Sequence, residues 1–192
     1  AFAEHDVELV LAARQVEGLE PPPGGSVVQL DVHAPPEGAF ERLGRPDGLL
    51  HLAWGGLPNY RSEHHVDAEL PAHYRLLATL VREGLQSLVA TGTCFEYGMQ
   101  SGELREDLET RPDNPYGIAK DALRQQLEQL RSEHPFQLTW ARLFYMYGEG
   151  QSPRSLFSLL QQALQDDAAS FPMSGGEQLR DFLPVETVAD YL

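Results

Sequence analysis

Cations are scarce in this sequence, and lysine is almost absent. Its 192 residues hold 14 lysines and arginines against 29 aspartates and glutamates, giving a formal net charge of −15. We therefore expect no nucleic-acid partner, because phosphate binding needs clustered cations. An anionic ligand would have to be held by local donors against the overall field. All these cations but one are arginine, so the single lysine, Lys120, needs its own explanation.

Cysteine and long apolar runs are lacking too. The single cysteine, Cys94, excludes an internal disulfide and fits a reducing cytosol, so we expect a cytoplasmic protein. No apolar run approaches the ~20 residues of a membrane span, so we expect no membrane partner. The first ten residues have no basic flank followed by an apolar run, which excludes a secretory signal there. They also lack an initiator methionine and begin as if within a helix, so we expect a truncated or incomplete chain.

Short apolar runs alternate with amphipathic stretches along the chain. Runs rich in β-branched and large apolar residues predict strands at 7–13, 26–32, 48–54, 87–93 and 137–145. Several of these runs lack strict alternation, which indicates burial on both faces, as in a parallel sheet. Helices are expected at 68–84, 116–132 and 152–164. The alternation predicts an α/β fold with a doubly wound parallel sheet.

Local signals mark the ends and faces of these helices. Gly84 is expected to end the first helix, and Ser152 and Pro153 to cap and begin the third. The middle helix carries one apolar stripe, made of Ile118, Ala119, Ala122, Leu123, Leu127 and Leu130. Residues 17–25 and 148–153 are loops by composition.

Tyr116 stands four residues before Lys120, so the two side chains share one face of a helix. A tyrosine titrates near a pKa of ~10, and a nearby ammonium group stabilises the phenolate and lowers that pKa. Arginine, with its broad planar fork, would not replace lysine neutrally. On spacing alone, a surface tyrosine packed on a lysine stem is the favoured reading.

Three segments directly follow predicted strands, where ligands bind in such sheets: Arg14, Ala53-Trp54-Gly55 and Thr93-Cys94-Phe95. The Thr93 hydroxyl could donate to a substrate oxygen. Taken alone, Thr93 is better explained as a strand-end residue that satisfies the backbone. Together with Tyr116 and Lys120, it could polarise a carbonyl or alcohol for hydride transfer.

Four segments carry a family resemblance: TGTCFEYG (91–98), NPYGIAK (114–120), ARLFYMYGEGQ (141–151) and LRDFLPVETVADYL (179–192). In order and spacing they resemble the extended short-chain dehydrogenase/reductases, in particular the nucleotide-sugar epimerase/dehydratase/reductase group. The resemblance implies a Rossmann dinucleotide-binding domain over 1–147 and part of a small substrate-binding lobe over 148–192. The first strand and the GxxGxxG turn of that family are missing from this sequence.

The resemblance also implies roles for individual residues. Thr93, Tyr116 and Lys120 would be the catalytic set, with Tyr116 as the acid/base. Lys120 would lower the pKa of Tyr116 and hold the nicotinamide ribose. Asp31 resembles the family's adenine-contacting acid, and Ala53 and Trp54 would lie beside the cofactor.

The cofactor is expected to be NADP or NAD. After the second strand, NAD enzymes usually carry an acid that binds the ribose hydroxyls. Here Arg14 stands near that point and could pair with a 2′-phosphate, which favours NADP. An exposed arginine with no ligand is the alternative.

The resemblance narrows the reaction. Dehydratases of the group carry Asp-Glu after the catalytic threonine, where this chain has Cys94 and Phe95. Epimerases typically have serine at the Thr93 position and asparagine at the Tyr145 position. We therefore expect a reductase of a nucleotide-linked 4-keto-6-deoxy sugar. The alternatives are a 4-epimerase with tightly bound NAD, and a non-catalytic dinucleotide-binding protein.

The substrate is expected to be a nucleotide-diphosphate sugar. Its expected contacts are Thr93, Cys94, Phe95, Tyr145 and Arg180. Arg180 matches a family arginine that contacts the diphosphate.

The resemblance further implies a homodimer formed through the helices near 66–83 and 116–132. The spacing of His64, His65 and His73 is not that of metal ligands, so no metal site is expected. Because they lie in a polar stretch, we expect these histidines to be solvated.

Overall fold

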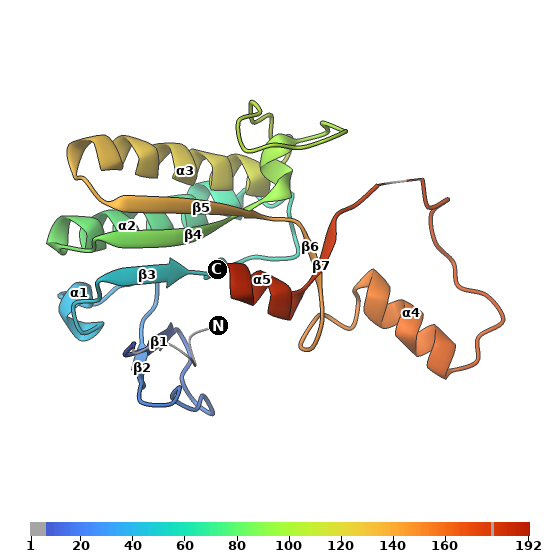
Figure 1. Ribbon diagram of the computed structural model, residues 1–192, viewed down its shortest axis with the longest axis horizontal. Coiled ribbons are helices and arrows are strands. Elements are labelled where there is room, and N and C mark those ends of the chain that lie inside the picture. Colours follow the sequence, from blue (N-terminus) through green and yellow to red (C-terminus); the bar gives the residue numbers. More distant parts are fainter. Residues whose placement is uncertain (1–6, 178) are drawn as a thin grey trace. The chain divides into compact units, whose positions relative to one another are not determined.

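The computed structural model describes residues 7–177 and 179–192 (Figure 1). They fall into two compact units, one ending at Arg142 and the other running from Leu143 to Leu192. The expectation that the chain begins within a helix concerns mainly residues 1–6, which lie outside the described residues.

The N-terminal unit contains two groups of strands. β1 (Val10–Ala13) pairs in parallel with β2 (Ser26–Gln29). β3 (Gly48–His51) pairs in parallel with β4 (Ser87–Thr93), and β5 (Gln137–Leu143) lies on the other side of β4. The α/β class and the parallel pairing are confirmed. Burial on both faces holds for β4, whereas β1 and β2 stay partly exposed.

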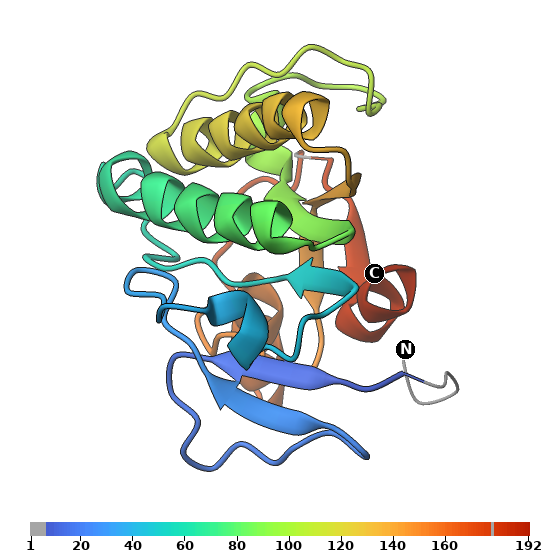
Figure 2. The same cartoon turned by 90° about the vertical axis from the view of Figure 1, so that its left-hand side faces the viewer.

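Helices cover one face of the β3–β4–β5 sheet. After the short α1 (Ala39–Arg42), a π-helical turn, η1 (His65–Glu69), leads into α2 (Leu70–Glu83). Figures 1 and 2 show α2 lying beside α3 (Pro115–Glu133) on that face. The core includes Leu76, Leu77 and Leu80 of α2, Leu88 and Ala90 of β4, and Leu123, Leu127 and Leu130 of α3. Ile118, which the predicted stripe included, is exposed instead.

Capping residues fix the two long helices. α2 ends at Gly84, whose φ of 123° few other residues adopt, as predicted. α3 begins at Pro115 because the Asn114 side-chain oxygen accepts a hydrogen bond of 3.0 Å from the Gly117 N–H. Tyr116 is thereby placed in the first turn of α3.

The C-terminal unit holds two parallel strands, β6 (Tyr145–Tyr147) and β7 (Phe182–Pro184), and two helices, α4 (Leu156–Gln165) and α5 (Val185–Tyr191). The predicted start of α4 was wrong. Ser155 caps this helix, whereas the Ser152 hydroxyl accepts the Arg154 N–H in a separate turn. Among the described residues, no helix combines the length and the apolar character that crossing a membrane requires.

Candidate active site

Thr93 ends β4 and begins η2, a short 3-10 helix (Cys94–Tyr97). Its N–H donates a 2.8 Å hydrogen bond to the Glu96 carboxylate, and its hydroxyl accepts one of 3.3 Å from the Phe95 N–H. This reciprocal pair is a capping box, which holds the turn in one conformation. Thr93 thus satisfies backbone groups at the strand end, as its position suggested. Its hydroxyl accepts in this turn and can still donate its hydrogen to another acceptor.

Glu96 is fully buried behind Thr93. Its carboxylate accepts hydrogen bonds from Arg142 Nε at 2.7 Å and from Trp140 Nε1 at 3.0 Å. Burial raises the pKa of Glu96, although the hydrogen bonds from Arg142, Thr93 and Trp140 oppose the shift. Glu96 was not among the residues predicted for the site. The Thr-x-x-Glu spacing of a capping box was the signal that could have found it.

Tyr116 approaches this turn from the start of α3. Its N–H donates to the Tyr60 carbonyl oxygen at 3.1 Å. The next residue must be glycine, because a Cβ at Gly117 would lie 2.7 Å from the Phe95 carbonyl oxygen. Burial raises the pKa of Tyr116 to about 12, opposed by a hydrogen bond with the Thr93 side chain. The structure therefore places Tyr116 beside the turn that Thr93 caps, with its ring 6.0 Å from that of Phe95.

Lys120 is buried beneath the same site. Its Nζ atom donates a 2.8 Å hydrogen bond to the Thr91 carbonyl oxygen and lies 4.2 Å from the centre of the Trp54 ring. Burial lowers the pKa of Lys120 to about 8, although the charges of Glu96 and Glu69 oppose this shift. The expected lowering of the Tyr116 pKa by Lys120 stays a prediction, since burial determines the direction of the Tyr116 shift here.

Aromatic side chains surround Tyr116. Its ring centroid lies 5.2 Å from that of His65, 5.6 Å from that of Tyr60, 6.0 Å from that of Phe95 and 6.1 Å from that of Trp54. Phe95, a predicted substrate contact, is thus beside the phenol, and Cys94 lies half-buried next to it in sequence. The site around Tyr116 has an apolar wall.

A cavity of about 540 Å³ lies within the N-terminal unit, lined by residues at the carboxyl ends of β1, β2 and β3. Four of the six residues predicted to contact the cofactor line it, Arg14, Asp31, Ala53 and Trp54, whereas the other two, Tyr116 and Lys120, are not among its lining residues. Trp54 also contacts the Lys120 ammonium and the Tyr116 ring. The predicted cofactor residues and the predicted catalytic residues are therefore connected through one side chain.

The expectation that His65 and His73 are solvated was wrong. Both are fully buried: His65 accepts a hydrogen bond from Trp54 Nε1 at 3.1 Å, and His73 contacts the buried Glu69 carboxylate at 3.0 Å. Glu69 explains why these histidines are buried: its own buried carboxylate needs hydrogen-bond donors, and imidazole N–H groups can supply them. Of its three histidine partners, His64 and His73 are close to it in sequence, whereas His33 comes from a distant segment that spacing does not reveal.

Tyr145 and Arg180 belong to the C-terminal unit. The Arg180 guanidinium lies 4.4 Å from the centre of the Tyr145 ring, and the Tyr145 N–H donates to the Asp181 carbonyl oxygen at 3.1 Å. The two residues predicted to contact substrate from this unit therefore lie together.

Comparison with known proteins agrees with the resemblance. The model of the NAD dependent epimerase/dehydratase family matches residues 1–192. dTDP-6-deoxy-L-talose 4-dehydrogenase (NAD(+)) of Aggregatibacter actinomycetemcomitans is 32% identical over 142 residues, which are 73% of this chain and 52% of that protein. The chain thus spans about half the length of this curated relative.

Solved structures show the same architecture. MoeE5 in complex with UDP-glucuronic acid and NAD is 27% identical, with a TM-score of 0.75 over 95% of this chain and 62% of that one. The structure of the UDP-glucose 4-epimerase of Thermotoga maritima with UDP-glucose is 20% identical. Its TM-score is 0.79 over 96% of this chain and 64% of that one, a likeness that shows the fold alone. By sequence and by fold, the chain belongs to the NAD dependent epimerase/dehydratase family.

Proposed function

We propose that this protein is an NAD-dependent oxidoreductase that interconverts a ketone and a hydroxyl group at C4 of a nucleotide-linked 6-deoxy sugar. The observation that carries the proposal is the position of Tyr116 at the start of α3, beside the turn that Thr93 caps, with the buried Lys120 one turn further along the same helix. The relative from Aggregatibacter, a 4-dehydrogenase of a dTDP-linked 6-deoxy sugar, supports this substrate class.

The cavity fits the adenosine half of a dinucleotide. Its lining is mostly apolar, as an adenine ring requires, and Asp31 and Arg14 supply polar groups at the ends of β2 and β1. Arg14 is exposed, so it can reach a ribose or a phosphate. Although the position of Arg14 suggested NADP, the relative from Aggregatibacter is an NAD(+) enzyme and the MoeE5 structure contains NAD, which favours NAD here.

Bound NAD(H) would accept or supply the hydride at the sugar C4. In the direction of reduction, the Tyr116 phenol donates its proton to the C4 oxygen as the hydride arrives at carbon, and the phenolate later takes a proton from solvent. The raised pKa of Tyr116, about 12, keeps this proton in place at neutral pH. The Thr93 hydroxyl steadies the same oxygen, and the apolar wall limits water around it.

The Lys120 ammonium has a different role. Its charge favours the Tyr116 phenolate, which oxidation of an alcohol needs as the base. Its position, fixed by the Thr91 carbonyl and the Trp54 ring, allows only small movements. We propose that Lys120 also hydrogen-bonds the ribose of the dinucleotide next to Trp54.

The assay uses the protein with NAD⁺ and dTDP-6-deoxy-L-talose, and in reverse with NADH and a panel of 4-keto-6-deoxy nucleotide sugars, followed by absorbance at about 340 nm. We expect turnover, lowered about 10²–10⁴-fold in Tyr116→Phe, because one proton donor is lost. Tyr191→Phe, which alters an exposed tyrosine in α5, is the matched control and should keep its rate.

Other outcomes separate the alternatives. Inversion at C4 without net change in NADH would assign an epimerase, with NAD released on denaturation. NAD binding without turnover on any sugar, unaltered in Tyr116→Phe, would assign a non-catalytic dinucleotide-binding protein.

We also propose a homodimer formed through α2 and α3. Light scattering that shows only monomer at high concentration would reject it.

A further inference from the structure

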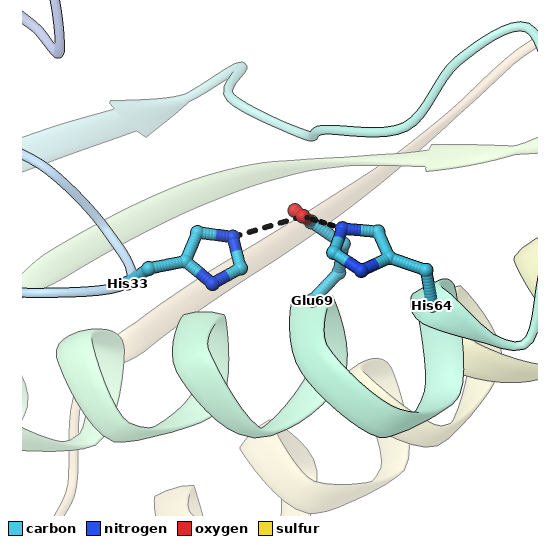
Figure 3. A group of neighbouring side chains, drawn as sticks. All are labelled: His33, His64 and Glu69. Atoms are coloured by element: carbon cyan, nitrogen blue, oxygen red, sulfur yellow. Dashed lines mark hydrogen bonds and ion pairs between the residues drawn. The ribbon is translucent and has the colours of Figure 1, made fainter.

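Three side chains that the proposed reaction does not use converge in the N-terminal unit (Figure 3). The Nε2 atoms of His33 and His64 each lie 2.8 Å from the Oε1 atom of Glu69. Figure 3 shows the two imidazoles on opposite sides of the carboxylate. All three ligand atoms lie within 4.8 Å of one another, so a single ion could contact them all.

The π-helical turn η1 creates this arrangement. His64 directly precedes η1 and Glu69 ends it, five residues later. In an α-helix, residues five apart point about 140° away from each other around the axis. In a π-helix, where the hydrogen bonds run from i to i+5, they fall on the same side, and such turns often occur at functional sites.

The other oxygen of Glu69 is already occupied. Oε2 accepts hydrogen bonds from the Gly55 N–H at 2.8 Å and from His73 Nε2 at 3.0 Å, and His73 Nδ1 in turn contacts His51 Nε2 at 2.8 Å. A Cβ at position 55 would lie 2.6 Å from Glu69 Oε1, so glycine there leaves room for the carboxylate. These contacts orient Glu69 as the outer partners of metal ligands do.

We propose that His33, His64 and Glu69 bind one divalent transition-metal ion of the zinc type. Two imidazole nitrogens and one carboxylate oxygen are ligands that Zn²⁺ prefers, whereas Mg²⁺ and Ca²⁺ prefer oxygen ligands throughout. The side chains of His33 and His64 are 37% and 47% exposed, so an ion has an entry path and a side open to a water ligand. The net charge of −15 also favours a cation.

Only small movements separate the observed cluster from a coordinated one. Bonds of about 2.0–2.1 Å at a tetrahedral angle set ligand atoms roughly 3.3 Å apart, about half an ångström more than the two present contacts with Oε1. The two Nε2 atoms, which now lie within 4.8 Å of each other, would have to come closer. The two half-exposed imidazoles can supply this shift by rotating. Each imidazole would bind the ion through an unprotonated Nε2, with its ring proton on Nδ1.

The ion would link two segments that are distant in sequence. His33 lies in the segment after β2, whereas His64 and Glu69 hold the start of α2. His33 and Glu69 also line the 540 Å³ cavity, so the metal would fix one part of its wall. We expect Zn²⁺ to raise the thermal unfolding midpoint of the protein, because it binds the folded state only.

The test uses tag-free protein, stripped with a chelator and titrated with ZnCl₂ by calorimetry without sugar or dinucleotide. We expect one Zn²⁺ per chain and no competition from Mg²⁺. His64→Ala should weaken binding about tenfold or more. The exposed His134 lies outside the cluster, so His134→Ala is the matched control and should bind like the unaltered protein.

Circular dichroism of each variant confirms that the fold is kept. Equal Zn²⁺ binding by the unaltered protein and by His33→Ala/His64→Ala would overturn the proposal, as would the absence of binding to the unaltered protein. Neither outcome bears on the proposed oxidoreductase, because the titration contains neither of its substrates.

Discussion

The Nζ atom of Lys120 donates a 2.8 Å hydrogen bond to the carbonyl oxygen of Thr91, which joins α3 to β4 two residues before Thr93. The same ammonium lies over the Trp54 ring, after β3. One side chain therefore connects the strand that carries Thr93, the helix that carries Tyr116 and the wall of the cavity. This explains why a chain that otherwise uses arginine has a lysine here.

Lys120→Arg keeps the positive charge, yet we expect it to abolish most of the activity. The guanidinium is planar and broader than an ammonium group, and the buried space between Thr91 and Trp54 cannot take it without displacing one of them. Overpacking of this kind costs about 1–3 kcal/mol of unfolding free energy. Urea unfolding and the turnover rate with NAD⁺ measure the two effects.

The matched control is Arg131→Lys on the same helix. Arg131 is exposed, so the exchange should leave both stability and rate unchanged. If Lys120→Arg turned over at the unaltered rate, the fit of the ammonium group would not matter for the reaction.

Glu96→Gln should destabilise the fold and lower the activity together. The substitution keeps the shape of the side chain but leaves the Arg142 guanidinium without its buried carboxylate. Removing one partner of a buried ion pair costs about 3–5 kcal/mol. The Thr93 turn should loosen as well, because its N–H donates to Glu96. The measurements are chemical unfolding and turnover at saturating sugar.

Glu41→Gln is the control for that experiment. Glu41 forms an ion pair of 2.6 Å with Arg45, but both side chains are exposed and the pair contributes little. If the two substitutions lowered the free energy of unfolding by similar amounts, burial of the Glu96 ion pair would not contribute to stability as proposed.

Sequence patterns predicted much of this fold and part of its site. Strands β1–β5 and helices α2, α3 and α4 carry local signals. Tyr116 and Lys120 are four residues apart on one helix, so spacing predicted that they share a face, but only the neighbouring motifs indicated a site there. The cluster around Glu69 could not be predicted in this way. His33 comes from a separate segment, and the π-helical turn brings together His64 and Glu69, which are five residues apart. Only the contact between Glu69 and His73 follows the i, i+4 rule on which helical spacing arguments depend.

Gly117→Ala tests the close approach of α3 to η2. Its Cβ would meet the Phe95 carbonyl oxygen at 2.7 Å, so the first turn of α3 must move away and take Tyr116 from Thr93. We expect a cost of about 1–3 kcal/mol and a large loss of turnover. In Gly48→Ala, where the nearest atom would be 3.8 Å away, stability should hardly change. Unaltered turnover in Gly117→Ala would contradict the proposed geometry.

The buried histidines should make the fold sensitive to acid. Burial, together with the charges of His73 and Lys120, lowers the pKa of His51 to about 3. Burial likewise lowers the pKa of His73 to about 4, although contacts with Glu69 oppose that shift. In the unfolded chain both titrate near ~6.5, so between pH 6.5 and 4 the unfolded state binds more protons than the folded state. Stability must therefore fall as the pH drops through this window.

The loss should amount to at most about 1.4 kcal/mol per pH unit for each histidine, measured by urea unfolding at a series of pH values. Glu69 extends the loss below pH 4.5, because hydrogen bonds from Gly55 and the histidines outweigh its burial and lower its pKa to about 2. His51→Gln retains a polar nitrogen where Nε2 meets His73 but cannot titrate, so it should flatten the slope between pH 6.5 and 4. The exposed His134→Gln should leave the slope unchanged. A slope that is the same in His51→Gln and in the unaltered protein would mean that His51 is not the group whose protonation opposes folding.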